Sequence, residues 1–273
     1  MKKFVEVLFK IVGFLLLWTT FSFVVQHSVS WGVSPLGNET VPQLLWAPAT
    51  AFLFAVLTSL LFFLAMDRKR MEFCITTKVF RDLGLAAFVG IFWIGGTIGL
   101  FFFNDNLSYD AVNIPPNLMV WILVVVLNVL TQELLLRGYI FSLLNEKYGG
   151  VVSVMTTALL FIVLNGSALA SGPVAIFFAF ASSTLYGLLR LYTGGILAPV
   201  FAHLLWNVVG GIVFGGVPLG ENVPSVLNGI VHTVNAASGG ELKFEGSTIA
   251  LLITIFLIDL LYILIREKEE SME

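Results

Sequence analysis

The chain has 273 residues, of which 58% are hydrophobic and only 11% are charged. Soluble domains are typically about 45–50% apolar and about 25% charged, so this composition excludes an ordinary soluble protein. The net charge of −3 gives no basis for a nucleic-acid partner. The only cysteine, Cys74, excludes an intramolecular disulfide and a CxxC metal site.

Apolar residues gather in eight stretches along the chain. Most of them approach the ~20 residues that a helix needs to cross a bilayer, and we expect the fifth and sixth to be short central helices. The predicted fold is therefore all-α: a polytopic membrane helix bundle of about eight transmembrane helices, forming a single integral membrane domain over 1–273. The stretches are Ile11–Val25, Leu44–Met66, Leu85–Phe103, Met119–Phe141, Val151–Leu164, Val174–Leu189, Ile196–Phe214 and Ile249–Ile265.

The lysines and arginines predict the orientation, because cytoplasmic loops are enriched in them. An eight-helix arrangement with both termini in the cytoplasm places only Lys243 clearly on the outer side. The short charged loops further suggest a multi-pass protein of a bacterial plasma membrane. The residues placed on the inner side are Lys2, Lys3, Arg68, Lys69, Arg70, Lys78, Arg81, Lys147, Arg190, Arg266 and Lys268.

Two further predictions concern the longest outer loop and the first apolar stretch. The longest outer loop, Gly215–Ser247, has space for a short helix around Val223–Val234. The alternative that the first stretch is a cleaved signal peptide rests on Met1-Lys2-Lys3 before the apolar run and Ser28-Val29-Ser30 after it. No further small-residue pattern supports cleavage.

The fourth stretch carries ionisable groups inside an apolar helix. Glu133 and Arg137 are four residues apart and share one helix face, whereas Gln132 points about 100° away and lies above Asn128. Such groups are costly in a membrane unless they pair or face a polar cavity, so they indicate a functional site by default. The alternative is an ion pair that only joins two helices.

A second polar row follows the seventh stretch at a spacing of four, and it contains His203 and Asn207. Its small members let another helix approach, and its polar members then bond across the gap. The alternative is interhelical packing without chemistry. In the fifth stretch Asn165 is a weaker candidate that is equally suited to end its helix, while Asp259 in the last stretch is isolated. The full row is Gly195, Pro199, His203, Asn207 and Gly211, and the third stretch has a packing pattern at Gly95 and Gly99.

These residues resemble the three motifs of the CPBP family, which comprises CAAX prenyl endopeptidases and bacteriocin-processing membrane proteins. The string Gln132-Glu-Leu-Leu-Leu-Arg137 resembles its Glu-Glu-x-x-x-Arg motif, and Phe161-Ile-Val-Leu-Asn165 resembles its Phe-x-x-x-His motif. The run Thr193–Asn207 resembles its His-x-x-x-Asn motif, with His203 and Asn207 in place. The motifs occur in the family's order and define a core over about 119–214.

The resemblance implies a helical bundle with a membrane-embedded polar cavity that receives a peptide or transmembrane segment. In active members a glutamate and a histidine activate water, and a second histidine and an asparagine polarise the scissile carbonyl. By position, Glu133 and Arg137 keep the second acid and the arginine of the first motif, and His203 with Asn207 keep the carbonyl-polarising pair.

Two positions depart from the family pattern: Gln132 replaces the water-activating glutamate, and Asn165 replaces the second-motif histidine. A carboxamide cannot act as a general base, and that loss typically lowers a rate by about 10²–10⁴. Neither amide replaces the carboxylate or imidazole that a metal would need, so we expect neither metal nor cofactor.

Three functions remain open from the sequence. The first is an intramembrane CAAX-type endopeptidase that works through Glu133, His203 and Asn207, with water held by Gln132 and Asn165. The second is an inactive family member that holds a membrane segment of a partner, such as an envelope enzyme, a sensor or a bacteriocin immunity system. The third is a transporter with Glu133, His203 and Asp259 as a proton path, for which no inverted repeat is visible.

Overall fold

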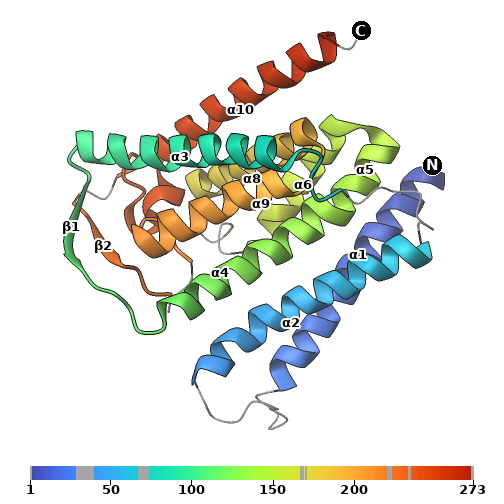
Figure 1. Ribbon diagram of the computed structural model, residues 1–273, viewed down its shortest axis with the longest axis horizontal. Coiled ribbons are helices and arrows are strands. Elements are labelled where there is room, and N and C mark those ends of the chain that lie inside the picture. The colour runs from blue at the N-terminus through green and yellow to red at the C-terminus, as the bar shows by residue number, and fades with distance from the viewer. Residues whose placement is uncertain are drawn as a thin grey trace. The chain divides into compact units, whose positions relative to one another are not determined.

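The structure is a computed structural model that describes residues 2–28, 40–66, 74–166, 169, 171–219, 223–232 and 235–271. Helices make up most of these residues (Figure 1). The α-helices are α1 (Lys2–Ser28), α2 (Thr40–Leu61), α3 (Val79–Phe103), α4 (Leu118–Glu133), α5 (Phe141–Tyr148), α6 (Gly150–Leu164), α8 (Pro173–Thr193), α9 (Leu197–Leu204) and α10 (Thr248–Glu270). The shorter elements are the π-helical turns η1 (Phe62–Met66), η2 (Leu134–Ile140) and η3 (Leu205–Val213), the 3₁₀ segment η4 (Gly240–Gly246), and the strands β1 (Leu107–Val112) and β2 (Leu227–Val231).

All eight predicted apolar stretches lie in helices, apart from Ile196 and Phe214 at the two ends of the seventh, which confirms the all-α class. Two shorter apolar helices accompany the six that are long enough to cross a bilayer, so the chain is a multi-pass membrane protein by its helix composition. The long spans are Lys3–His27, Gln43–Met66, Val79–Phe103, Leu118–Tyr148, Pro173–Thr193 and Gly240–Glu270, and the short helices are Gly150–Leu164 and Leu197–Val213. Val29 and Ser30 of the signal-peptide alternative, and Arg68 to Arg70, lie outside the described residues.

The prediction that the fifth and sixth stretches are short was right for the fifth and wrong for the sixth. The sixth helix, α8, has 21 residues and continues through Arg190 to Thr193, past the last apolar residue of the predicted stretch. Gly194 then ends it in a left-handed conformation (φ 78°), which glycine adopts without steric cost. The seventh helix is the short one, because the backbone turns at Gly195 before α9 begins at Leu197.

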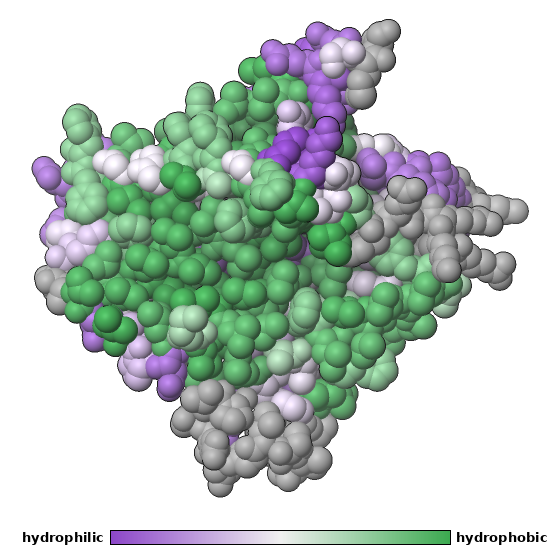
Figure 2. Space-filling view, viewed as in Figure 1, coloured by the Kyte–Doolittle hydropathy of each residue, from purple (hydrophilic) through white to green (hydrophobic). Residues whose placement is uncertain are grey.

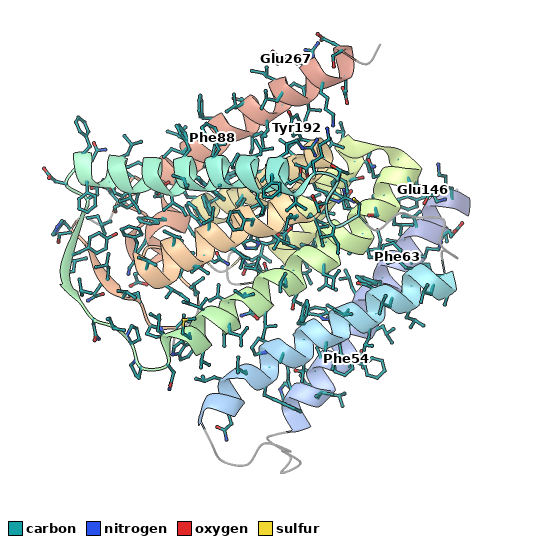
Figure 3. The ribbon with its side chains drawn as sticks, in the orientation of Figure 1. Phe54, Phe63, Phe88, Glu146, Tyr192 and Glu267 are labelled. Carbon is teal, nitrogen blue, oxygen red and sulfur yellow. The ribbon has the colours of Figure 1, made fainter. Side chains whose placement is uncertain are left out.

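The described chain divides into two compact units, 1–73 with 117–153 and 74–116 with 154–273. In the first unit α2 packs against α1 and α4. Its core centres on Tyr139 of η2, whose ring stacks on Phe14 at 4.5 Å and meets Phe62 and Phe63 edge-on, each at 5.4 Å. Phe54 of α2, labelled in Figure 3, stacks on Phe21 of α1 at 5.5 Å.

The second unit contains α3, α8, α9 and α10, which pack against one another around buried aromatic rings. Trp93 of α3 and Trp206 of η3 stack at 4.1 Å between ring centroids, and Phe178 of α8 lies 5.4 Å from Trp206. The indole N–H of Trp93 donates to the Thr254 hydroxyl of α10 at 2.9 Å, which satisfies a buried polar group. These contacts hold the helix that carries the third motif.

A two-stranded antiparallel sheet, β1 with β2, joins two of the predicted outer loops in the second unit (Figure 1). Leu107 pairs with Val231 and Tyr109 with Gly229. The short helix expected around Val223–Val234 is therefore wrong, because Leu227–Val231 forms a strand; residues 233 and 234 lie outside the described residues. A strand at this position satisfies its backbone groups by pairing with a distant loop, which local sequence does not reveal.

The glycines also pack differently from the prediction. Gly95 and Gly99 of α3 are exposed, and an added Cβ would meet no atom of the described residues within 4 Å at either position. The close contacts of α3 occur instead at Gly90, against Leu205. At Gly195 the chain that approaches is the extended segment 74–77 and not a helix, because a Cβ there would lie 2.5 Å from the Ile75 carbonyl oxygen.

The outward faces of the helices are apolar, as a lipid-facing surface requires. Figure 2 shows hydrophobic residues over α3 and hydrophilic residues at the C-terminal end of α10. Phe88, labelled on α3 in Figure 3, is 57% exposed, and Phe103 at the end of the same helix is 85% exposed. In contrast, Trp93 and Phe101 of α3 are fully buried, so the aromatic residues of this helix divide between lipid and core.

Candidate functional site

The first motif holds a buried ion pair at the junction of α4 and η2. The Arg137 Nη1 atom donates to Glu133 Oε1 at 3.3 Å, and both side chains are 0% exposed. The prediction that the two residues share one face is thus confirmed by direct contact. Because removal of one partner from a buried pair leaves an uncompensated charge, the pair is strongly coupled to the fold of the first unit.

Gln132 occupies the position of the missing glutamate and is half-buried in α4. As the residue before Glu133, it projects about 100° further around the helix and faces a different direction from the ion pair. Asn128, one turn earlier, is exposed. The first motif therefore presents one amide outside the ion pair, and its only carboxylate lies within the pair.

In the first and third motifs, the two polar residues are four positions apart, and an α-helix gives way to a π-helical turn between them. Glu133 is the last residue of α4 and Arg137 lies in η2, while His203 lies in α9 and Asn207 in η3. The wider turn is visible in bonds such as Phe214 N–H to the Val209 carbonyl at 3.0 Å. Single π-helical turns occur frequently at functional sites, and periodicity alone does not reveal them because the apolar pattern continues through them.

His203 is nearly buried in the second unit, with 4% of its surface exposed. Its imidazole stacks on the Tyr186 ring of α8 at 4.5 Å, with the planes 20° apart, and the Phe161 ring of α6 lies 6.1 Å away edge-on. Asn207, one turn later, is half-buried. The predicted pair therefore consists of an oriented imidazole followed by a less enclosed amide on the same helix.

Phe161 is the aromatic residue of the Phe-x-x-x-His pattern, and its ring lies beside His203. The second motif is therefore next to the third. Asn165 follows Phe161 by one turn and directly succeeds the last residue of α6. Its backbone N–H donates to the Phe161 carbonyl at 2.8 Å, so Asn165 ends the helix, and its side chain is half-buried. The structure thus places Asn165, His203 and Asn207 in one unit, and Gln132, Glu133 and Arg137 in the other.

The start of α9 is held by the extended segment before α3. The N–H groups of Ile196 and Leu197 donate to the carbonyls of Cys74 at 3.2 Å and Ile75 at 2.9 Å. A helix N-terminus otherwise leaves its first N–H groups without partners, so this segment caps the helix that carries His203. Gly195 permits the contact because it has no Cβ.

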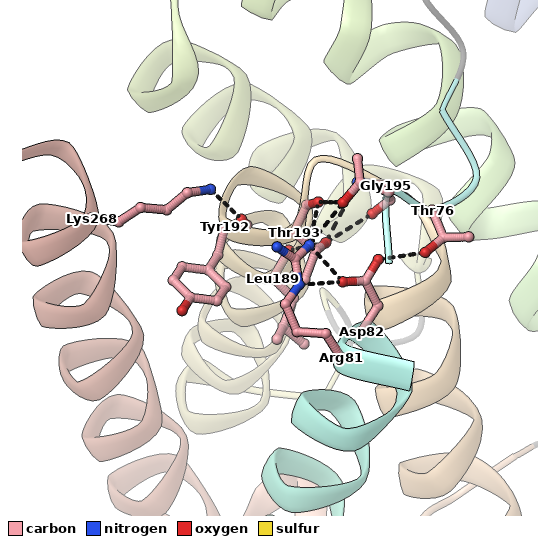
Figure 4. A network of polar contacts seen from close by, with 9 residues as sticks. Thr76, Arg81, Asp82, Leu189, Tyr192, Thr193, Gly195 and Lys268 are labelled. Atoms are coloured by element: carbon pink, nitrogen blue, oxygen red, sulfur yellow. Dashed lines mark hydrogen bonds and ion pairs between the residues drawn. The ribbon is translucent and has the colours of Figure 1, made fainter. Parts of the chain in front are cut away.

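A polar network fixes that segment in place (Figure 4). The carboxylate of Asp82 is fully buried and accepts hydrogen bonds from the Thr76 hydroxyl at 2.6 Å and from Arg81 Nη2 at 2.7 Å. Arg81 also donates to the Thr193 carbonyl at 3.0 Å, at the end of α8. Lys268 of α10 donates to the neighbouring Tyr192 carbonyl at 2.9 Å. Cations at the carbonyl end of α8 also suit its helix dipole.

Two acidic residues near the third motif were not singled out from the sequence. Asp82 was missed because the predicted third stretch began at Leu85, after the polar start of α3. Glu245 was missed because it falls in a long outer loop; its carboxylate accepts the indole N–H of Trp206 at 3.4 Å. The neighbouring Phe244 is fully buried beside Phe101, at 4.9 Å between ring centroids, and this contact anchors η4 against the core of the second unit.

Neither a metal cluster nor an internal proton path emerges from the described residues. Among them, no group of three His, Cys, Asp and Glu side chains is arranged to hold a metal ion. Asp259 is exposed on α10, whereas His203 of the same unit is nearly buried, so the two do not form a continuous internal row. The expectation that neither metal nor cofactor is bound stays a prediction.

The fold and the motifs define a polytopic helical membrane protein with buried ionisable residues. Residues 114–209 match the family model for type II CAAX prenyl endopeptidases, Rce1-like. The chain therefore carries an Rce1-like type II CAAX prenyl endopeptidase family domain over these residues, which confirms the resemblance seen in the three motifs. The matched region includes all six candidate site residues. No curated protein sequence matches the chain.

Proposed function

We propose that this protein binds a peptide or transmembrane segment of another protein at a polar site within the membrane, and that it does so without ordinary hydrolysis. The proposal takes the three motifs as parts of one site, as in the CAAX protease family. Bound segments would come from a partner such as an envelope enzyme, a sensor or a bacteriocin immunity system.

One observation carries the proposal: the only carboxylate of the first motif is committed to an ion pair. Glu133 is 0% exposed and lies 3.3 Å from the Arg137 guanidinium, while the adjacent position holds the amide Gln132. A general base must accept a proton within hydrogen-bond reach of the attacking water, and a carboxamide has no such basicity. Asn165 removes basicity in the same way at the second motif.

The third motif supports binding because its hydrogen-bonding groups are retained. The Tyr186 ring fixes the plane of the His203 imidazole, and Asn207 follows one turn later with a half-buried amide. Donors oriented in advance can grip a carbonyl oxygen of a bound segment even where no water is activated. We therefore assign recognition to His203 and Asn207, and a positioning role to Glu133 and Arg137.

A second candidate, the intramembrane endopeptidase, is favoured by that same complete third motif. In this version Glu133 takes the proton from a water that Gln132 and Asn165 hold, and the hydroxide attacks a carbonyl polarised by His203 and Asn207. The amine leaves with the proton, and two peptides result. The reaction requires Glu133 to leave its buried pair, which is the reason we rank this candidate second.

The orientation with both termini in the cytoplasm belongs to the proposal, as does a bacterial plasma membrane. In the second unit, contacts gather the start of α3, the end of α8, the start of α9 and the end of α10. In the first unit, Lys3 donates to the Lys147 carbonyl at 2.8 Å, which places the start of α1 beside the end of α5. Alternating crossings in which these ends share the cytoplasmic side agree with both sets of contacts.

The proposal is tested with purified protein in lipid nanodiscs, incubated with prenylated CAAX peptides and with transmembrane peptides. We expect binding without cleavage, weaker binding for Asn207→Leu, and unchanged binding for Asn128→Ala, an exposed amide on α4. The double substitution Gln132→Glu/Asn165→His restores the family pattern and is expected to introduce cleavage. Cleavage by the wild type that disappears in Glu133→Gln/Arg137→Met, a double variant that leaves no unpaired buried charge, would overturn the proposal in favour of the endopeptidase.

A further inference from the structure

The last apolar helix, α10, carries an acidic residue on an exposed face. Asp259 is exposed on α10, seven residues before Arg266 and eleven after Thr248. At a rise of about 1.5 Å per residue, it lies about 10 Å from the charged end of the helix. The hydrocarbon core is about 30 Å thick, so a side chain as short as aspartate does not reach the headgroups from this depth.

Asp259 belongs to a face of α10 that the second unit does not cover. The opposite face packs inside the unit through Ile253, Leu257 and Leu261, which are at most 9% exposed. Figure 1 shows the C-terminal half of α10 standing clear of α3. The exposed residues follow one another at spacings of three and four, the pattern of a helix–helix seam. They are Leu252, Ile255, Phe256, Asp259, Tyr262, Ile263 and Arg266.

Tyr262 supplies a hydrogen-bond donor at the level of Asp259. Side chains of an α-helix lean toward its N-terminus, so the phenol of Tyr262 covers the surface one turn above its own Cα. Tyr262 is 54% exposed, and among the described residues neither Tyr262 nor Asp259 has a hydrogen-bond or ion-pair partner. The face thus holds one acceptor and one donor at the same depth in the membrane, and ionisable groups at such depth are otherwise paired.

We propose that α10 is the interface of a symmetric dimer of this chain. Two copies inserted in the same orientation are related by a two-fold axis along the membrane normal, so each Tyr262 hydroxyl meets the Asp259 carboxylate of the other copy. A surface that carries a donor and an acceptor side by side is complementary to itself under two-fold symmetry. A partner helix with a lysine or arginine would neutralise Asp259 but would offer no acceptor to Tyr262. The dimer goes beyond peptide binding and does not depend on it.

The test uses the full-length chain in lipid membranes, in a Cys74→Ser background that removes the only native thiol. Ile263→Cys places a thiol on the proposed seam at a site that is 53% exposed, and Ile91→Cys places one on α3 at a site that is 66% exposed. Under mild oxidation we expect covalent dimers from Ile263→Cys and at least tenfold fewer from Ile91→Cys. Asp259→Leu combined with Tyr262→Phe should lower the Ile263→Cys yield at least tenfold, because both pairing groups are lost.

Leucine and phenylalanine suit a lipid-facing helix, so this variant should keep its fold, which its thermal transition checks. Single-molecule photobleaching of labelled protein in liposomes should show two copies for the wild type and one for the double variant. Single copies in the wild type would overturn the proposal. Equal cross-linking at both cysteine positions, a yield unaffected by Asp259→Leu/Tyr262→Phe, or cross-links of Ile263→Cys to a different protein alone would overturn it as well.

Discussion

At the scale of single residues, this molecule contains one buried and one exposed ion pair of the same spacing. The Glu133–Arg137 pair has no exposed surface, whereas Arg266 and Glu270, at the same spacing of four and 3.2 Å apart, are 61% and 67% exposed. Water screens the second pair and not the first, so the same geometry has very different energetic weight. This contrast provides a matched experiment.

Arg137→Met should lower the free energy of unfolding by about 3–5 kcal/mol, because Glu133 is left buried without its cation. Arg266→Met should change it by less than about 1 kcal/mol. Unfolding in mixed detergent micelles, followed by circular dichroism, measures both. The double variant Glu133→Gln/Arg137→Met should recover most of the loss; a double variant as unstable as Arg137→Met would contradict the assigned pairing.

Tyr109 of β1 makes a second prediction at this scale. Its hydroxyl is buried without a hydrogen-bond partner among the described residues, and burial raises the pKa of Tyr109 to about 12. Because the unfolded chain ionises near pH 10, the stability associated with this group is complete below about pH 10 and is lost as the pH rises through about 12. Tyr109→Phe removes that dependence and leaves the protein equally or more stable at pH 7.

The measurement is an absorbance titration of phenolate at 295 nm for the wild type and Tyr109→Phe. The difference between the two curves should have its midpoint near pH 12. A difference with its midpoint near pH 10, the ordinary value for an exposed tyrosine, would show that the phenol is hydrated.

At the scale of elements, the segment before α3 determines where the third motif begins. Sequence periodicity predicted the helix containing His203 and the small residues that precede it. It did not predict that an extended chain, rather than a helix, packs on Gly195. That contact pairs residues about 120 positions apart, and the network of Thr76, Arg81 and Asp82 holds it in place.

Gly195→Ala should lower the free energy of unfolding by about 1–3 kcal/mol, because its Cβ would lie 2.5 Å from the Ile75 carbonyl oxygen and 2.7 Å from Thr76 Cα. Gly99→Ala is the control: no atom of the described residues lies within 4 Å of that added Cβ. Alanine within a helix is favoured over glycine by about 0.5–1 kcal/mol, so this variant should be unchanged or slightly more stable. Thermal unfolding of the two variants in the same detergent compares them, and equal losses would be inconsistent with the capping contact.

At the scale of the whole molecule, the apolar stretches and the positions of the cations predict an even number of crossings with both termini inside. Single cysteines near Lys3 and at Glu273 should react with an impermeant maleimide only after the cytoplasmic side is opened. A cysteine in place of Lys243, which is half-buried, loses the lysine's hydrogen bond to the Gly215 carbonyl and should react in intact cells. A dye-accessible C-terminus in intact cells would exclude the eight-crossing arrangement.

The amino-acid sequence alone determined the fold class, the positions of the eight apolar helices and the three motifs with their two amide substitutions. These features are local, because they depend on the length of each apolar stretch and on residue spacing. The thickness of the bilayer determines which stretches are long enough to cross it. The pairing of Glu133 with Arg137 also followed from spacing alone. Local pattern was insufficient where a helix ends on a polar residue, as α8 does at Thr193.

Only the tertiary structure decided the π-helical turns within both motif pairs, the strand pairing of β1 with β2, and the cap that segment 74–77 places on α9. It also decided which polar residues are enclosed, since His203 packs on Tyr186 while Asp259 lies on an open face. The physical reason is that these features satisfy backbone and side-chain polar groups through partners far away in the chain. A local sequence pattern specifies the need for such partners but not their identity.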